Sequence, residues 1–353
     1  MKDRGMISGC LRLLAVAAAM AGSYSAAWGY QTQTPETDTL KAQLQAIAQE
    51  HHGKVALFAT QLNTGKTVAL DQDLPVQTAS DIKLAILYHA MVEVREGRAK
   101  WDEKITLKPG DPVGGSGMLH FFDTPLTVTL KDVLTMMVIV SDNTATNMAI
   151  DRFGVDAVNA RVESLGLKNT HLYKKVTKPA TGPMPADQPK FGLGKTTPAE
   201  MAELMAAIGT CSLRPEKRST QPEKLAFPLF SEPDAQDKAV CEVGLGMLKD
   251  QFYRETIPRY LPNGGDQSVA SKTGSLDAVR NDVAIVQGKS GPIILSIFTY
   301  ANTDHGWTVD NEGEVTIAKL AKAIVSVWSP EGLDAKGLVP GLGLAGSGVA
   351  TRQ

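Results

Sequence analysis

Apolar residues recur with helical spacing in the middle of the chain and with strand spacing near both ends. Leu40, Leu44 and Ile47 mark an amphipathic helix near the N-terminus. The apolar runs 55–59 and 67–70 then flank an Asn-Thr-Gly turn and indicate a β-hairpin. Helical patterns dominate from there to Gly209.

Helical spacing resumes over 243–252, and strand patterns follow it. The runs 269–273, 279–286 and 293–300 are separated by turn signals, and an amphipathic helix is expected over 315–328. Strands at both ends with helices between them predict one antiparallel sheet built from both ends of the chain, with a helical block packed alongside. The predicted fold class is α/β, of the α+β type.

Three stretches lack this periodicity. Residues 171–197 form a long segment rich in Pro and Gly, which indicates a functional or disordered loop. Residues 212–240 are polar and are interpreted as an insertion, and the Gly-rich residues 331–353 predict a flexible tail. Residues 341–346 match GxGxxG, but no strand pattern precedes them, so they predict no nucleotide site.

The N-terminus has the pattern of a secretory signal peptide. Basic residues precede a short apolar run over 13–21, and Ser25-Ala26-Ala27 supplies the small residues of a cleavage site. The run is too short to span a membrane. We therefore expect a signal peptide over 1–29, a linker over 30–37, secretion to the periplasm and no stable membrane insertion.

Composition narrows the function classes. The chain of 353 residues has a net charge of −2, without the basic excess of nucleic-acid-binding proteins. Its six histidines lack metal-ligand spacing, so no metal and no other cofactor is expected. Cys211 and Cys241 flank the expected insertion. In an oxidising compartment either a disulfide between them or two unpaired thiols fits the sequence.

Candidate chemistry begins at Ser80, three residues before Lys83. If a helix starts near Ser80, both side chains share a face of its first turn, which places a nucleophile beside a base. A simple N-cap and a surface charge explain the same spacing. Two further motifs favour the catalytic interpretation. Ser141-Asp142-Asn143 follows an apolar helix, Lys272-Thr273-Gly274 ends a strand, and the three motifs in this order form a strong signal.

With these motifs the chain resembles class A β-lactamase-type serine hydrolases of the penicillin-binding protein superfamily, over about residues 38–330. The resemblance extends to the run 141–147, to Thr196-Thr197-Pro198 and to Asn281-Asp282. It implies one compact domain, expected to be a monomer, that acts on a small β-lactam or a cell-wall peptide. Asp142 and Asn147 are interpreted as braces for the loops.

The resemblance implies a role for each catalytic residue. Ser80 attacks a carbonyl carbon and becomes acylated, while Lys83 accepts its proton. Lys272 is a neighbouring cation that lowers the pKa of Lys83. Ser141 relays a proton to the leaving nitrogen.

The resemblance also implies a set of substrate-binding residues. Asn143 binds an amide of the substrate, and Thr273 and Gly274 belong to the motif that holds a substrate carboxylate. The backbone N–H of Ser275 completes an oxyanion hole with that of Ser80. Arg280 is either a second carboxylate contact or part of a surface ion pair.

One element of the family pattern is missing. Class A enzymes carry a glutamate in the loop before Thr196, where it activates the water that removes the acyl group. Counted forward, its position falls on Val176, and counted backward it falls on Thr181. From His171 to Thr197 the one carboxylate is Asp187, a possible substitute base. Acylation is therefore expected to outpace deacylation.

Three functions remain open on the sequence alone. The first, and the one favoured by the extended class A match, is a β-lactamase. The second is a D-alanyl-D-alanine carboxypeptidase or endopeptidase, or an esterase, which the missing glutamate favours. The third is a slowly deacylating penicillin binder.

Overall fold

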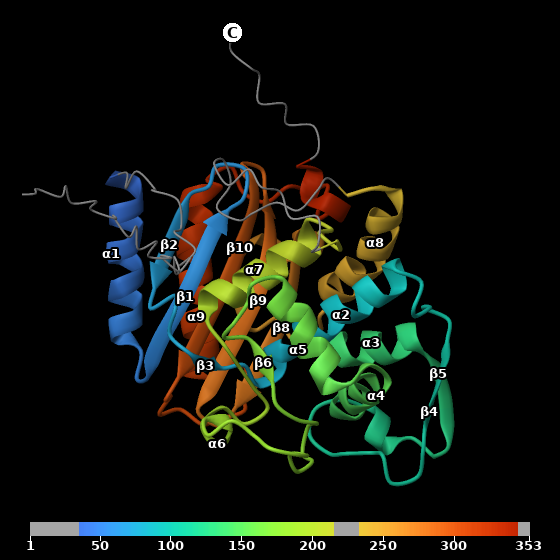
Figure 1. Cartoon of the computed structure of the whole chain (residues 1–353). Helices are drawn as coiled ribbons and strands as arrows, with labels where there is room; N and C mark the ends of the chain where they lie inside the picture. The colour runs from blue at the N-terminus through green and yellow to red at the C-terminus, as the bar shows by residue number, and fades with distance from the viewer. Residues whose placement is uncertain (1–34, 215–232, 345–353) are drawn as a thin grey trace, which may run out of the picture.

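The structure is a computed structural model that describes residues 35–214 and 233–344 (Figure 1). The predicted signal peptide, most of the linker, residues 215–232 of the predicted insertion and the tail beyond Leu344 lie outside the described residues. Within the described ranges, no helix has the length and apolar character needed to cross a bilayer.

A five-stranded antiparallel sheet forms the centre of the molecule, in the order β2-β1-β10-β9-β8. Its strands are β1 (Lys54–Gln61), β2 (Thr67–Leu70), β8 (Val269–Leu276), β9 (Val279–Gly288) and β10 (Gly291–Tyr300). β1 pairs with β10 along its whole length, from Lys54 opposite Tyr300 to Gln61 opposite Ile293. The prediction of one sheet built from both chain ends is confirmed.

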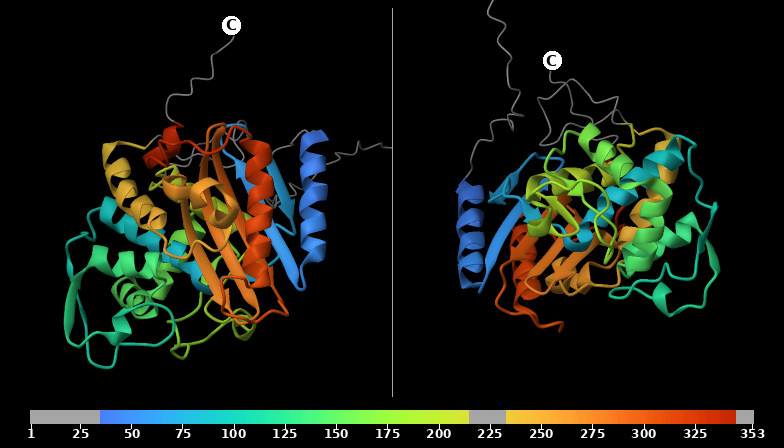
Figure 2. Two further views of the ribbon diagram at one scale, coloured as in Figure 1. Left: turned by 180° about the vertical axis from the view of Figure 1, so that it is seen from behind. Right: turned by 60° about the horizontal axis from the view of Figure 1, so that its bottom comes forward.

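Helices cover both faces of this sheet. α1 (Pro35–Glu50) and α9 (Glu312–Trp328) pack together on one face, seen in front of the strands in the rear view of Figure 2. Leu40 and Leu44 of α1 are buried there. The start of α1 overlaps the segment predicted as a linker, residues 30–37. Burial of the apolar stripe of α1 stabilises the helix. The opposite face carries α7 (Pro198–Gly209) and the helical block.

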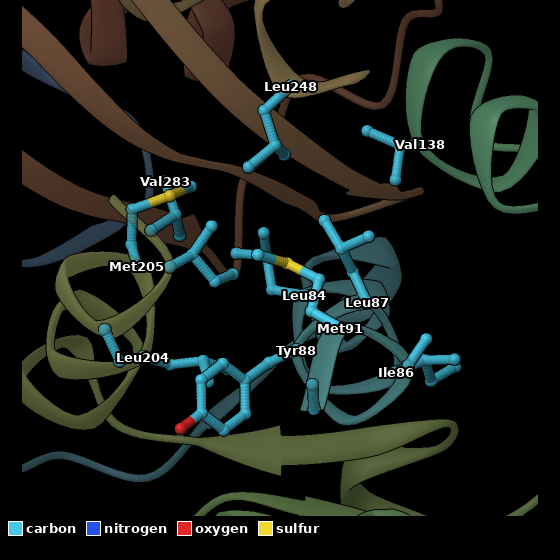
Figure 3. Packing of buried hydrophobic residues seen from close by; sticks show 14 of the residues in the cluster. Leu84, Ile86, Leu87, Tyr88, Met91, Val138, Leu204, Met205, Leu248 and Val283 are labelled. Atoms are coloured by element: carbon cyan, nitrogen blue, oxygen red, sulfur yellow. The ribbon is translucent and has the colours of Figure 1, made fainter. Parts of the chain in front are cut away.

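The helical block is centred on α2. Its members are α2 (Lys83–Arg95), α3 (Leu130–Ile139), α4 (Asn143–Phe153), α5 (Val155–Ser164) and α8 (Ala235–Lys249). α2 is buried without interruption from Lys83 to Val92, which explains why its sequence is apolar on every side. In Figure 3, Leu84 and Met91 of α2 lie among Met205 of α7 and Val283 of β9.

Several short elements were not predicted. β3 (Val76–Gln77), β6 (His171–Leu172) and β7 (Gly194–Thr196) form a small sheet, β4 (Lys104–Leu107) pairs with β5 (Leu126–Thr129), and α6 (Gln188–Phe191) is a single turn. Elements of two to four residues are too short to display a hydrophobic period. Residues 171–197 are thus held by β6, α6 and β7.

Two predicted boundaries are wrong. α8 begins at Ala235, within the expected insertion, because Asp234 and Asp237 form a capping box at its start. The predicted flexible tail is packed as far as Leu344. Leu338 and Leu342 are buried in the core, since apolar side chains between the glycines find cover there.

Cys211 and Cys241 are joined by a disulfide, with their Cα atoms 5.4 Å apart. The bond links the residues just after α7 to the middle of α8. The alternative of two unpaired thiols does not describe the structure.

Candidate active site

A cavity of about 340 Å³ lies where the three sequence motifs meet. Ser80, Ser141, Thr273 and Ser275 all line it. These residues come from the N-terminal, middle and C-terminal parts of the chain, so the fold gathers the predicted catalytic groups into one place.

The nucleophile candidate stands in a 3₁₀ turn, η1 (Ala79–Ile82), and α2 begins only at Lys83. Ser80 is therefore inside the turn and caps neither element, which excludes the N-cap interpretation. Ala79 has a φ of 44°, in the left-handed region that costs a non-glycine residue roughly 1 kcal/mol. Such local strain is typical of positions that present a reactive side chain.

Lys83 is fully buried beside Ser141, so it is not a surface charge. Its Nζ donates hydrogen bonds to the carbonyl oxygen of Ser141 at 2.7 Å, to Ser141 Oγ at 3.0 Å and to Asn143 Oδ1 at 3.2 Å. Burial, followed by the positive charge of Lys272, holds the pKa of Lys83 well below its usual value. The three donated bonds use all the N–H groups of the protonated amine, and loss of one proton frees a lone pair with which Lys83 can accept a proton.

Ser141 connects the two lysines. Its Oγ accepts a hydrogen bond from Lys272 Nζ at 3.1 Å as well as the one from Lys83. Burial lowers the pKa of Lys272 to about 8, opposed by the charges of Asp81 and Asp282. Because Ser141 Oγ only accepts in these two bonds, its own proton can pass to another atom in the cavity.

The loop that carries Asn143 is held by Asp142. Asp142 Oδ1 accepts from Ala145 N at the start of α4, and Oδ2 accepts from the N–H groups of Met118 and Leu119. Asn143 Nδ2 donates to Gly114 O, so its carboxamide is already oriented. Asp142 thus braces the loop, as its interpretation from sequence proposed.

Gly274 has a role that the motif alone does not reveal. A Cβ at this position would lie 2.7 Å from Thr78 O and 2.9 Å from Asp81 Oδ1. Its neighbours Thr273 and Ser275 share the opposite, cavity-facing side of β8. Gly274 therefore acts as a spacer that lets β8 approach the turn of Ser80, and it presents no side chain to a substrate.

Val176 and Thr181, the two positions counted for the missing glutamate, lie in different surroundings. Asn147 Nδ2 donates to Val176 O at 3.1 Å, and Val176 N donates to Asn147 Oδ1 at 2.8 Å. This clamp holds the main chain of Val176 against α4, one turn beyond Asn143. Thr181 is exposed.

Asp187 does not serve as a substitute in this arrangement. Its Oδ2 pairs with Lys195 Nζ at 2.7 Å, and its Oδ1 accepts from the hydroxyl of Tyr173 at 3.0 Å. These bonds, the one to Lys195 first, lower the pKa of Asp187. Asp187 is not among the residues that line the cavity.

Arg280 lies behind the cavity wall, and only 1% of it is exposed. Its guanidinium donates to main-chain carbonyl oxygens, among them Gly306 O at 2.6 Å, and lies 4.6 Å from the ring centroid of Trp307. Its Nε is 3.3 Å from Glu314. Because Trp307 and Glu314 line the cavity, Arg280 supports that wall. Arg280 therefore takes part in an ion pair, as one of the two interpretations has it, but its own side of the pair is buried and not on the surface.

Two buried carboxyl groups near the lysines were missed. Asp81 and Asp282 are both fully buried, and burial raises the pKa of each, to about 7 for Asp282. Charged residues next to a catalytic motif usually face solvent, so no sequence signal distinguished these two. Trp307 and Tyr253 of the cavity wall likewise belong to no motif.

Comparisons with known proteins show which family the chain resembles. The model of the β-lactamase enzyme family matches residues 39–328. β-Lactamase SME-1 of Serratia marcescens is 22% identical over 312 residues, which cover 84% of this chain and 91% of that protein. The family model and this relative each match nearly the whole of the described chain.

Solved structures show the same fold. A β-lactamase from Sphaerobacter thermophilus has a TM-score of 0.65 at 27% identity, covering 82% of this chain and 96% of that one. A mutant of PBP-A, in acyl-enzyme complex with penicillin G, has a TM-score of 0.65 at 22% identity, covering 84% and 100%. The chain belongs to the β-lactamase enzyme family.

Proposed function

We propose that the protein is a secreted serine hydrolase that opens the amide bond of a β-lactam and forms an acyl-enzyme at Ser80. The observation that carries this proposal is the convergence of two buried lysines on Ser141 Oγ in the cavity that Ser80 lines. Lys83 supplies the base and Lys272 the positive charge, so a single site contains both groups that acylation requires.

The reaction follows from these positions. Neutral Lys83 takes the proton of Ser80 as its Oγ bonds to the carbonyl carbon, and the N–H groups of Ser80 and Ser275 stabilise the oxyanion. The C–N bond then breaks, and the nitrogen receives a proton through Ser141. Lys272 and Thr273 hold the substrate carboxylate, while Asn143 orients an amide.

Removal of the acyl group is the slow step of the proposed reaction. Val176, which the forward count assigns to the place of the family's glutamate, has no carboxylate, and Asp187 is engaged with Lys195. We therefore expect the ester at Ser80 to persist for much longer than it takes to form. A second candidate function is favoured by the same observation, namely a peptidase or esterase that acts on D-alanyl-D-alanine peptides and is trapped by penicillins.

Intact-protein mass spectrometry of the chain without its signal peptide tests the proposal. Incubation with benzylpenicillin should add one penicilloyl group that persists, and Ser80→Ala should abolish the adduct. Lys83→Met, which removes the base but keeps an unbranched side chain of similar size, should slow acylation by about 10²–10⁴-fold.

Further outcomes separate the candidates. Rapid hydrolysis of nitrocefin without an adduct would contradict the slow step, while release of D-alanine from a pentapeptide would favour the peptidase. A wild-type chain that neither gains an adduct nor hydrolyses nitrocefin would overturn the proposed function.

A further inference from the structure

The cavity beside Ser80 has one wall whose side chains take no part in the proposed acylation. The wall comes from the segment before η4 (Ile257–Tyr260), from the loop between β10 and α9, and from the first turn of α9. Its lining side chains include Tyr253, Glu255, Trp307 and Glu314. Because the ester at Ser80 can form without them, these side chains are free to determine which substrate binds.

The segments of this wall are joined to each other and to the central sheet. Arg259 of η4 donates to Val309 O and pairs with Asp310 at 2.7 Å, which ties the two loops together. Thr256 Oγ1 donates to Asp282 Oδ2 at 2.6 Å, which anchors the first segment to β9. The wall is therefore held in place by the protein itself before any substrate binds.

The wall begins where the carboxylate-binding strand ends. Thr273, which holds the substrate carboxylate in the proposed reaction, and Ser275 lie on the same side of β8 and both line the cavity. Ser275 pairs with Arg280 of β9, whose guanidinium lies 4.6 Å from the ring centroid of Trp307. A group attached next to the carboxylate of a bound substrate therefore extends towards Trp307.

The charge on this wall is negative. Among the described residues, those that line the cavity include Glu255 and Glu314 but neither lysine nor arginine. Glu314 is 3.3 Å from Nε of Arg280, which offsets its charge. Glu255 makes no hydrogen bond or ion pair with any described residue, and the adjacent Arg254 donates to Gly264 O at 2.8 Å. The negative charge of Glu255 is thus left for a ligand.

The wall also exposes aromatic surface at the mouth of the cavity. Trp307 is 66% exposed, and Tyr253 and Val309 beside it in the cavity lining are exposed as well. A continuous exposed apolar patch marks a binding site more often than an ordinary surface does. Arg280 covers one face of the Trp307 ring, so the other face can stack on a flat group. A flat ring with a positive charge would use both this face and Glu255.

We propose that Glu255 and Trp307 are specificity-determining residues that favour β-lactams with a flat cationic group next to the carboxylate, such as the pyridinium of a cephalosporin. The inference rests on the proposed function and names the substrate class for the same cavity. The two charges of such a zwitterion match the two ends of the cavity, because its carboxylate meets Lys272 and Thr273 while its cation meets Glu255.

Three cephalosporins with the same thienylacetamido group separate charge from stacking. Cephaloridine carries a pyridinium, nitrocefin a flat neutral dinitrostyryl group, and cephalothin a small neutral acetoxymethyl group. Stopped-flow kinetics gives the second-order acylation rate of each. Glu255→Gln should lower the ratio of the cephaloridine rate to the cephalothin rate by about fivefold or more and should leave the nitrocefin ratio as it is. Trp307→Leu should lower both ratios by about threefold.

Two controls isolate the charge of Glu255. Glu331→Gln removes an exposed carboxylate that does not line the cavity, so it should leave every ratio as in the wild type. Added salt should lower the cephaloridine ratio of the wild type, because salt screens exposed charges, and this measurement needs no variant to fold. A cephaloridine ratio that Glu255→Gln does not lower, or that salt leaves constant in the wild type, would overturn the inference.

Binding without acylation separates this inference from the proposed function. In ¹⁵N-tryptophan-labelled Ser80→Ala, which cannot be acylated at residue 80, cephaloridine should shift the indole NMR signal of Trp307 at lower concentrations than cephalothin does. Equal concentrations for the two compounds would count against the cation preference. If cephalothin fails to acylate the wild type, the proposed function fails, and the titration of Ser80→Ala still decides the role of Glu255 and Trp307.

Discussion

Asn147 and Val176 are joined by two hydrogen bonds, one in each direction between the carboxamide of Asn147 and the main chain of Val176. The clamp fixes the backbone of residue 176 without using its side chain. A different side chain can therefore be introduced there while the loop keeps its position.

We predict that Val176→Glu shortens the lifetime of the penicilloyl adduct by about 10²-fold or more, because a carboxylate held by this clamp can activate a water. Mass spectrometry after removal of free penicillin gives the decay rate. Val176→Gln has the same size without the base, and it should keep the long-lived adduct. Equal decay in the two variants would show that the clamp does not aim residue 176 at the ester.

Gly274→Ala should lower both stability and acylation. The added Cβ would meet Thr78 O at 2.7 Å and Asp81 Oδ1 at 2.9 Å, closer than real contacts allow, so β8 must move away from the turn of Ser80. We expect an acylation rate at least about tenfold lower, since small displacements of catalytic groups are costly.

Gly246→Ala is the matched control for that change. Gly246 lies inside α8, and a Cβ there would meet nothing within 4 Å. Alanine should stabilise this helix by about 0.5–1 kcal/mol and leave the acylation rate unchanged. Thermal unfolding measures the stability of both variants, and stopped-flow kinetics measures their acylation rates. Equal acylation rates in Gly274→Ala and Gly246→Ala would contradict the role of Gly274 as a spacer.

Reduction of the bond between Cys211 and Cys241 should destabilise the folded protein. The two cysteines are separated by 30 positions, and opening a loop of that length costs about 3–4 kcal/mol in the chain-entropy model. Urea unfolding with and without reductant measures the difference. The Cys211→Ala, Cys241→Ala double variant should behave as the reduced protein does and should not respond to reductant.

His89 should make the protein sensitive to mild acid. It is buried in α2, and this burial lowers its pKa from 6.5 to about 4. Between these values the unfolded chain binds a proton that the folded protein does not, so stability falls as the pH decreases. From pH 6.5 to 4 the loss attributable to His89 should be about 2–3 kcal/mol. His89→Gln should show a flatter decline in unfolding experiments, and parallel curves would contradict this assignment.

The long elements could be predicted because each displays its own period. The strands of the central sheet and helices such as α1 and α9 extend over enough residues for apolar positions to repeat. The 3₁₀ turn at Ser80 could not be predicted in the same way, since the positive φ of Ala79 is imposed by surrounding contacts and an alanine gives no local sign of it.

The residues of the candidate site likewise divide into those that the sequence predicts and those that it does not. Ser80, Lys83 and Ser141 stand in short motifs whose spacing is visible in the sequence. By contrast, the burial of Asp282 and the withdrawal of Arg280 behind Trp307 depend on which segments pack over them. Such environments are properties of the assembled fold, and no window of the sequence contains them.

The pairing of β1 with β10 has a consequence for synthesis on the ribosome. Ser80 and Lys83 emerge early, but the strand that carries Lys272 and the strand that completes the sheet are translated near the end. Contacts between such distant parts of a chain form slowly. A nascent or prematurely terminated chain therefore contains the nucleophile without the second lysine, and it should be unable to react until translation is almost finished.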